Sequence, residues 1–230
     1  MIIHGLQKLT LLDYPEKTAC TLFSGGCNFR CPYCHNSSLV LDPTSQEVID
    51  EKELFSFLKK REGLLDGICL TGGEPLINND IEDFLEKLRK YDYLIKLDTN
   101  GSFPDKLKSI INKGLVDYVA MDIKNSKEKY PITIGIENYD IAPILKSVNL
   151  LLKGKIKYEF RTTVVKQFHE VSDFIEIGKW IEGAPRYYLQ AFKNSENTIG
   201  RNLSSHDEKT MKAMQNQVKN YIKTVELRGI

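Results

Sequence analysis

Three cysteines lie within eight residues of one another in the first sixth of the chain. Cys27, Cys31 and Cys34 form a CxxxCxxC arrangement, in which a short irregular loop can turn three sulphur atoms toward one centre. Thiolates are soft ligands that suit zinc and iron–sulphur clusters. A structural zinc site normally has four protein ligands, whereas a four-iron cluster on three cysteines leaves one iron open to an exogenous ligand. The spacing therefore indicates a metal centre and leaves both kinds of centre open.

The other two cysteines, Cys20 and Cys69, lie inside strands that the sequence predicts, and we expect them to be small core residues. Five cysteines, three of them crowded together, do not form a disulfide framework. Residues 1–5 are not followed by the basic region, apolar run and cleavage site of an export signal. We therefore expect a cytoplasmic chain.

The composition excludes several classes of protein. The 230 residues include 32 Lys plus Arg and 31 Asp plus Glu, and the net charge of +1 implies no electrostatic attraction to nucleic acid or anionic lipid. No apolar run approaches the roughly 20 residues that span a bilayer. With 41% hydrophobic and 27% charged residues the chain is an ordinary globular protein. Because no Pro/Gly/Ser-rich linker divides it, we expect a single domain over residues 1–230, with the cysteine loop at 24–36.

Short apolar runs alternate with amphipathic stretches, a pattern that is typical of strand–helix units around a parallel sheet. Strands are expected over residues 18–23, 67–71, 93–98, 116–123, 156–165 and 186–192. Helices are expected over residues 45–61, 80–91, 105–113, 141–152, 171–181 and 207–223. The first helix would open with Thr44 and Glu47 as a capping box. Six units are fewer than the eight of a closed barrel, so the pattern predicts an α/β fold, an open partial (β/α)6 barrel.

The unusual polar residues follow the ends of these strands. The cysteine loop follows the first strand, and Gly72, Gly73 and Glu74 follow the second. Asp98 ends the third strand and begins the run Asp-Thr-Asn-Gly, and the fourth ends in Asp122, Ile123 and Lys124. Carboxyl ends of parallel strands are where such folds place their active sites.

Each motif also has an ordinary interpretation. Gly-Gly-Glu-Pro and Asp-Thr-Asn-Gly are turn signatures, and Asp122 with Lys124 could be a simple ion pair at a strand end. A carboxylate that ends a buried strand, such as Asp98, is costly unless it finds a cation or hydrogen-bond donors. Arg161 lies in a strand that looks buried, and we favour an orientation toward the barrel interior over an edge position.

The run from Cys27 to Asn36 resembles the cluster loop of the radical S-adenosylmethionine (SAM) enzymes, with aromatic Tyr33 just before the third cysteine. Within that superfamily, LLDYP at 11–15, the run 17–23 and Gly-Gly-Cys at 25–27 resemble the activating proteins of anaerobic ribonucleoside-triphosphate reductase. The match is close over the first forty residues and continues as spaced motifs to about Gln190. Glu16 stands where the family pattern has glycine.

The resemblance implies a mechanism and a set of site residues. Cys27, Cys31 and Cys34 would hold a [4Fe–4S] cluster whose open iron binds SAM, and one electron would cleave SAM into methionine and a 5′-deoxyadenosyl radical. That radical would remove a hydrogen atom from a glycine of a glycyl-radical enzyme, here anaerobic ribonucleotide reductase. An electron donor such as flavodoxin or ferredoxin is also implied, together with a monovalent cation shared by Asp98 and Asp122. The residues expected around SAM are Tyr33, Cys34, His35, Gly72, Gly73, Glu74, Asp98, Asp122, Ile123, Lys124 and Arg161.

Two kinds of alternative remain at this point. Within the same superfamily, the chain could activate another glycyl-radical enzyme or act on a small molecule. From a different class, it could be a non-catalytic zinc or iron–sulphur protein in which the cysteines stabilise a loop or relay electrons. The motifs after the second and fourth strands argue against that class, because an electron relay needs no SAM pocket.

Overall fold

The protein is built around a single eight-stranded sheet in which sequence order is also spatial order, β1 to β8. The computed structural model describes residues 1–230. β1 is antiparallel to β2, and every later pair of neighbours is parallel. The strands are β1 Ile3–Thr10, β2 Ala19–Ser24, β3 Gly67–Gly72, β4 Leu94–Thr99, β5 Tyr118–Asp122, β6 Lys157–Val164, β7 Arg186–Ala191 and β8 Thr224–Arg228.

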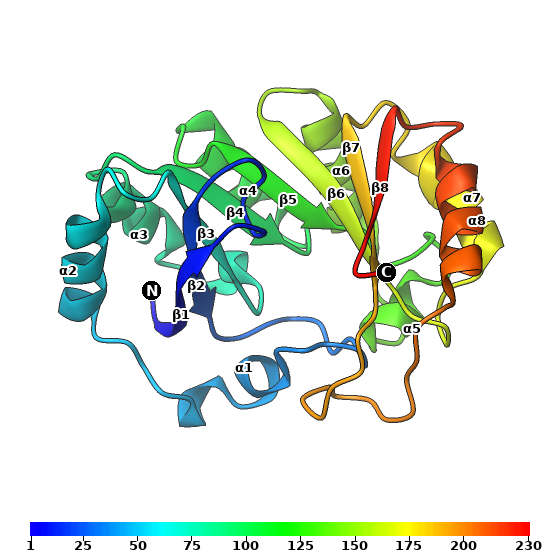
Figure 1. Ribbon diagram of the computed structural model, residues 1–230, viewed down its shortest axis with the longest axis horizontal. Helices are drawn as coiled ribbons and strands as arrows, with labels where there is room; N and C mark the ends of the chain where they lie inside the picture. The colour runs from blue at the N-terminus through cyan, green and yellow to red at the C-terminus, as the bar shows by residue number, and fades with distance from the viewer.

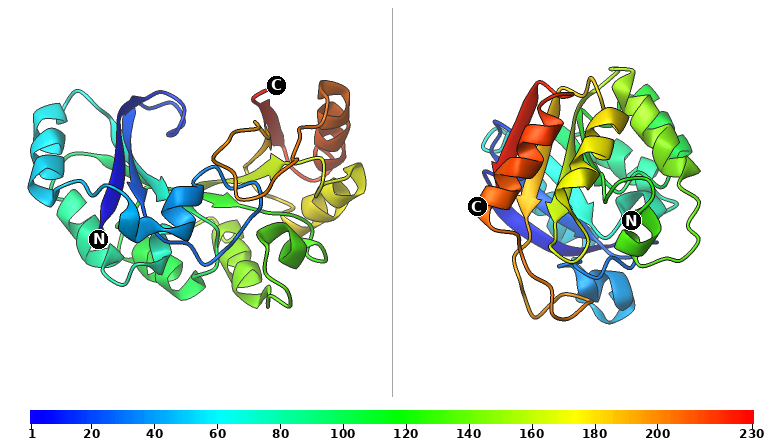
Figure 2. Two further views of the ribbon diagram at one scale, coloured as in Figure 1. Left: turned by 90° about the horizontal axis from the view of Figure 1, so that it is seen from below. Right: turned by 90° about the vertical axis from the view of Figure 1, so that its right-hand side faces the viewer.

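The sheet curls into an arch that does not close, since β1 and β8 stay at its two edges without pairing (Figures 1 and 2). The long helices lie on the outer, convex side of the arch, while the short α1 belongs to the segment that crosses its open side (Figure 2). The helices are α1 Ser37–Leu41, α2 Glu51–Arg61, α3 Ile81–Leu88, α4 Pro104–Asn112, α5 Tyr130–Ile134, α6 Ala142–Leu152, α7 Val171–Trp180 and α8 Glu208–Val218. None of them has the length and apolar composition that a bilayer crossing needs.

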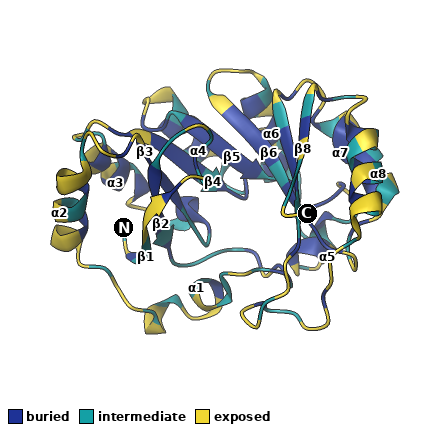
Figure 3. Cartoon of the chain, in the orientation of Figure 1, coloured by how far each residue is buried: buried dark blue, intermediate teal, exposed yellow.

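The hydrophobic core fills the layer between the sheet and its outer helices, and strands β2 to β7 are mostly buried (Figure 3). In β6, Phe160 and Val164 are fully buried in this core. Arg161 and Thr163 alternate with them and line the inner face of the arch instead. Cys20 and Cys69 are completely buried, as expected for small core residues.

The expected open α/β barrel is confirmed, with two additional strands. The six predicted strands correspond to β2 to β7, each within a few residues of its expected bounds. The two strands not predicted from the sequence are β1, which pairs antiparallel on one edge, and β8, which extends the parallel sheet on the other. The last helix is accordingly shorter than predicted, because α8 ends at Val218 and the chain turns into β8.

The predicted start of the first long helix was wrong. Pro43–Ser45 forms a separate 3₁₀ turn whose cap is Asp42, and Thr44 donates to that same aspartate instead of opening a helix. α2 begins at Glu51, where the Asp50 side chain accepts hydrogen bonds from two backbone N–H groups of the first turn. Asp50 is therefore the N-cap that the sequence analysis assigned to Thr44.

Glu16, the residue that replaces the glycine of the family pattern, adopts a left-handed backbone conformation with φ of 62°. Glycine reaches that region without steric cost, whereas a residue with a Cβ atom does not. Pro15 and Glu16 belong to the loop between β1 and β2, and the neighbouring Tyr14 packs on Tyr118 with 5.8 Å between ring centroids. The loop is thus held against the amino ends of the parallel strands, in a conformation that suits glycine better than glutamate.

Candidate active site

The loops that follow β2, β3, β4 and β5 converge on one cavity at the carboxyl ends of the strands. All but two of the thirteen residues predicted for the cluster and SAM line this cavity. The eleven are Cys27, Cys31, Tyr33, Cys34, His35, Gly72, Gly73, Asp98, Asp122, Lys124 and Arg161. Glu74 and Ile123 are the exceptions. Asn36, Thr99, Asn100 and Thr163 also line it and were not predicted.

Cys27, Cys31 and Cys34 all face the cavity from the loop between β2 and α1. Burial raises the pKa of the Cys27 thiol to about 12 and that of Cys31 to about 11, and it also raises the pKa of Cys34. No group of three or more histidine, cysteine or acidic side chains is arranged as the ligand set of a single metal ion. Three thiols on one cavity wall are a donor set that suits an iron–sulphur cluster, and binding would displace their protons.

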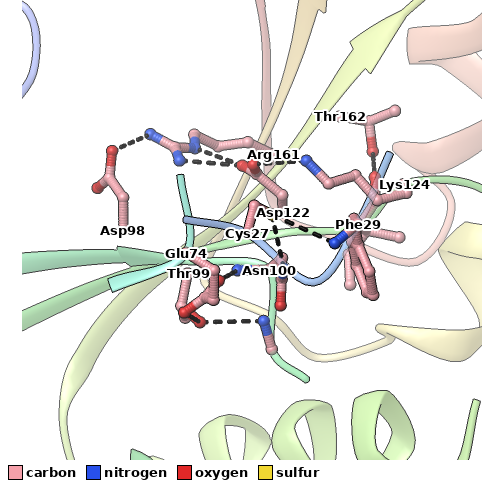
Figure 4. A network of polar contacts seen from close by, with 12 residues as sticks. Cys27, Phe29, Glu74, Asp98, Thr99, Asn100, Asp122, Lys124, Arg161 and Thr162 are labelled. Carbon is pink, nitrogen blue, oxygen red and sulfur yellow. Dashed lines mark hydrogen bonds and ion pairs between the residues drawn. The ribbon is translucent and has the colours of Figure 1, made fainter. Parts of the chain in front are cut away.

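Five charged side chains of alternating sign cross the inner face of the sheet, and we call them the charge ladder: Lys96, Asp98, Arg161, Asp122 and Lys124. The last four are labelled in Figure 4. Arg161 Nη1 lies 3.1 Å from Asp98 Oδ2, and Arg161 Nη2 lies 2.9 Å from Asp122 Oδ1. Lys124 Nζ lies 2.9 Å from Asp122 Oδ2, and Lys96 pairs with Asp98 at the other end. The ladder comes from β4, β5 and β6 and from Lys124 just after β5, and it confirms that Arg161 points into the barrel.

The ladder keeps both aspartates ionised despite their burial. Burial alone would raise the pKa of Asp122, but the Lys124 ammonium and the Arg161 guanidinium outweigh it and hold the pKa at about 2. Burial acts on Asp98 in the same direction, and Arg161 with Lys96 lowers its pKa. The guanidinium thus lies where a shared cation was expected. A monovalent cation bound by Asp98 and Asp122 stays a prediction.

The Glu74 carboxylate does not reach the cavity. It is fully buried and accepts hydrogen bonds from the backbone N–H groups of Leu76 (3.1 Å) and Asn100 (2.5 Å) and from the Thr99 hydroxyl (2.8 Å). Burial raises the pKa of Glu74 to about 7, and these donors oppose that rise. Both oxygens are used within the protein, so the expected contact with the SAM amino group is not available to this side chain. Ile123 is likewise buried in the core.

The two glycines before Glu74 allow the loops after β2 and β3 to touch. A Cβ atom added to Gly73 would lie 1.9 Å from the carbonyl oxygen of Gly26. The Glu74 N–H donates to that same carbonyl at 2.8 Å, and Asn36 Nδ2 donates to the Gly72 carbonyl at 2.7 Å. The glycines are therefore required by the close contact with the cysteine loop.

Tyr33 and His35 lie in the cavity wall on either side of Cys34. The Tyr33 ring is buried, and its hydroxyl has no hydrogen-bond partner within the protein. A buried hydroxyl without a partner is unfavourable, and a ligand in the cavity can supply one. The His35 ring stacks on Phe192 with 5.3 Å between centroids, which ties the cysteine loop to the segment after β7.

Two further residues, next to the cavity, were also not identified from the sequence. Lys96 has no solvent-exposed side-chain surface, and the signal was its position two residues before Asp98 in an apolar strand, which puts both side chains on one face. His169 is also fully buried; its Nε2 donates to the Lys124 carbonyl at 2.8 Å, and its Nδ1 accepts from the Val165 N–H at 3.1 Å. It connects the loop after β6 to the end of the charge ladder.

Residues 21–181, from β2 to the end of α7, match the family model of the radical SAM superfamily. The chain belongs to the radical SAM superfamily. Its matched region contains the three cysteines and the whole charge ladder. As a radical SAM enzyme it uses a [4Fe–4S] cluster and SAM, so the non-catalytic zinc protein considered from the sequence is set aside.

One relative in sequence and two solved structures show which radical SAM proteins this chain resembles. A candidate glycyl-radical enzyme activating enzyme of Methanocaldococcus jannaschii is 29% identical over all of this radical SAM chain and 96% of its own length. The fold resembles a domain of pyruvate-formate lyase-activating enzyme from Bacteroides vulgatus, with a TM-score of 0.57 and 12% identity over 71% of this chain and 99% of that one. SuiB of Streptococcus suis, solved with S-adenosylmethionine, gives a TM-score of 0.67 and 13% identity over 91% of this chain and 52% of SuiB. The chain thus spans about half of SuiB.

Proposed function

We propose that the protein is a SAM-dependent activase that generates a glycyl radical on anaerobic ribonucleoside-triphosphate reductase. The observation that carries this proposal is the convergence of three thiols and the charge ladder on one cavity at the open side of the arch. The full-length similarity to the M. jannaschii protein supports the activase class. The choice of ribonucleotide reductase as the partner rests on the resemblance of the N-terminal forty residues.

In this proposal Cys27, Cys31 and Cys34 would hold the cluster, and the cavity offers no fourth thiol as a ligand. When bound, the reduced cluster supplies the electron that splits SAM into methionine and a 5′-deoxyadenosyl radical. The protein's own task is to hold SAM in place and to keep water and oxygen away from the site. Cys31 is buried and Cys27 and Cys34 are half-buried, which serves the second purpose.

The cavity offers cationic and polar groups that suit the two ends of SAM. Lys124 and Arg161 line it with an ammonium and a guanidinium, which suit the methionine carboxylate. Gly72 and Gly73 bring backbone groups close to the ligand space without side chains. The unpartnered hydroxyl of Tyr33 and the ring of His35 lie near the third cysteine, where we place the adenosine part.

The open side of the arch gives a macromolecular partner a route to the cavity. Since β1 and β8 do not pair, the arch stays open between its two edge strands (Figure 2). A glycine-bearing loop of the partner would enter there. A flavodoxin or ferredoxin in the same cytoplasmic compartment would supply the electron.

The test is whether a glycyl radical forms on the partner enzyme. The cluster-loaded, reduced protein is mixed anaerobically with SAM and the anaerobic ribonucleotide reductase of the same organism, and electron paramagnetic resonance (EPR) spectra are recorded. We expect a glycyl radical signal that is lost when the radical-bearing glycine of the reductase is changed to alanine. A signal on a different glycyl-radical enzyme, with none on the reductase, would contradict the choice of partner and keep the activase class.

A further inference from the structure

Asn100, which follows β4, has a side chain whose orientation is fixed by its neighbours. Its Oδ1 accepts from the Ser102 N–H at 2.9 Å and from the Ser102 hydroxyl at 2.5 Å. A backbone N–H can only donate, so the oxygen of the amide must face Ser102 and the NH₂ group must face the other way. There, Asn100 Nδ2 donates to Asn28 Oδ1 at 3.0 Å and reaches Cys27 Sγ at 3.8 Å (Figure 4).

The sulphur of Cys27 therefore accepts from two N–H groups of the protein. The second is the backbone N–H of Phe29, 3.4 Å from the sulphur. Asn100 is almost completely buried, with 6% of its surface exposed, so water does not compete strongly for its amide. Hydrogen bonds to the sulphur ligands are one of the means by which proteins set the reduction potential of an iron–sulphur cluster.

The buried Glu74 carboxylate holds this arrangement together. It accepts the backbone N–H of Asn100 on one oxygen and the hydroxyl of Thr99 on the other. The backbone N–H of Glu74 donates to Gly26, the residue directly before Cys27. The loops after β3 and β4 are thereby joined to the cysteine loop at the point where Asn100 meets the sulphur (Figure 4).

We propose that Asn100 is a positioning residue that donates a hydrogen bond to the Cys27 sulphur and raises the reduction potential of the cluster, with Glu74 fixing Asn100 in place. The inference rests on the proposed binding of the cluster by Cys27. Its physical reason is that the reduced cluster carries one more negative charge than the oxidised one, part of it on the ligand sulphurs. A donor aimed at a sulphur stabilises the more negative form and so makes reduction easier.

The experiment measures the reduction potential of the cluster-loaded protein, without SAM, by spectroelectrochemical titration. Asn100→Ala removes the donor, and Asn78→Ala is the matched control, because the Asn78 amide donates to the Pro75 carbonyl and does not line the cavity. At the potential that half-reduces the wild type, we expect the ratio of reduced to oxidised cluster to fall by up to about tenfold in Asn100→Ala, which corresponds to about 59 mV for a one-electron couple. Asn78→Ala should behave as the wild type.

The outcomes separate the inference from the proposed function. Asn100→Ala protein with the wild-type iron content and an unchanged potential would overturn the inference alone. Wild-type protein that takes up no iron would overturn both.

A measurement on the wild type covers the case in which Asn100→Ala fails to retain the cluster. Protein carrying ¹⁵N only in its asparagine side chains is reduced and studied by pulsed EPR. We expect a hyperfine coupling between the cluster and a side-chain amide nitrogen, and its absence would overturn the inference without any variant.

Discussion

The guanidinium of Arg161 on β6 donates to the carboxylate of Asp98 at the end of β4, with Nη1 and Oδ2 3.1 Å apart. The two strands are not neighbours, because β5 lies between them. The contact therefore bridges three strands on the inner face of the arch and orders the wall against which we place SAM. Asp98 and Asp122 thus share one guanidinium, and each also pairs with a lysine.

Replacing Arg161 should destabilise the protein more than an ordinary surface change. In Arg161→Met the carboxylates of Asp98 and Asp122 lose the cation between them, while their burial remains. Removing one partner of a buried ion pair costs about 3 kcal/mol, and chemical denaturation should show a loss of that size. Lys179→Met, which breaks an exposed ion pair with Glu176, is the control and should cost below about 1 kcal/mol. A similar small loss in Arg161→Met would contradict the role given to the charge ladder.

His169 should make the protein less stable on mild acidification. Burial lowers the pKa of His169 below its ordinary value, and a proton on Nδ1 would face the Val165 N–H that this nitrogen accepts. The unfolded chain then binds more protons than the folded one, so the stability from neutral His169 is complete above about pH 6.5 and is lost as the pH falls.

His169→Gln tests this contribution, because glutamine keeps a donor for the Lys124 carbonyl and does not titrate. Urea unfolding of the wild type should lose about 1 kcal/mol more than the variant between about pH 8 and about pH 5.5. Equal losses in the two proteins would show that His169 does not titrate in the predicted direction.

Gly73→Ala should separate the cysteine loop from the loop after β3. The new Cβ atom would overlap the Gly26 carbonyl, only 1.9 Å away, so the loops must move apart. We expect a stability loss of about 2 kcal/mol together with a lower iron content after anaerobic reconstitution. In Gly114→Ala nothing lies within 4 Å of the added atom, but φ is +66°, so that variant should lose about 1 kcal/mol and keep its iron. Full iron content in Gly73→Ala would contradict the importance of this contact.

Glu16→Gly should stabilise the protein. The left-handed backbone at Glu16 costs a residue with a Cβ atom about 1–2 kcal/mol, and the greater freedom of glycine in the unfolded chain offsets about half of that. We expect a net gain of about 0.5–1 kcal/mol by chemical denaturation. Glu16→Ala also loses the exposed pair with Arg186 but keeps the strained backbone, so it should show no gain. Equal changes in stability for Glu16→Gly and Glu16→Ala would show that the effect comes from the lost ion pair and would contradict the backbone explanation.

The sequence was most informative where residue type and strand position coincide. Asp98, Asp122 and Lys124 could be placed at one edge of the sheet because parallel strands bring their carboxyl ends together. Arg161 could be directed inward because an arginine in a buried strand must find anions. In each case the residue type and its position in the strand were enough to predict the edge or the face of the sheet on which the side chain lies.

The sequence was less informative about which groups each side chain hydrogen-bonds to. Glu74 was assigned to a ligand, yet its carboxylate is used by Thr99 and Asn100 on the neighbouring loop, a choice that depends on the separation of two strands in space. His169 could not be identified from the sequence because its partners are backbone groups, which leave no trace in residue types. β1 was missed because its residues do not alternate between buried and exposed: only Ile3 and Thr10 are buried, and residues 7–9 are all exposed.

The central claim is that three thiols in this cavity hold a cluster that binds and reductively cleaves SAM. Its most direct test is a single-turnover reaction of the anaerobically reconstituted, reduced protein with SAM, in which methionine and 5′-deoxyadenosine are quantified. We expect the wild type to form both products in equal amounts, Cys31→Ser to form neither, and Cys20→Ala, at a buried core cysteine, still to form both. Wild-type protein with a complete iron–sulphur cluster that leaves SAM intact would contradict the claim.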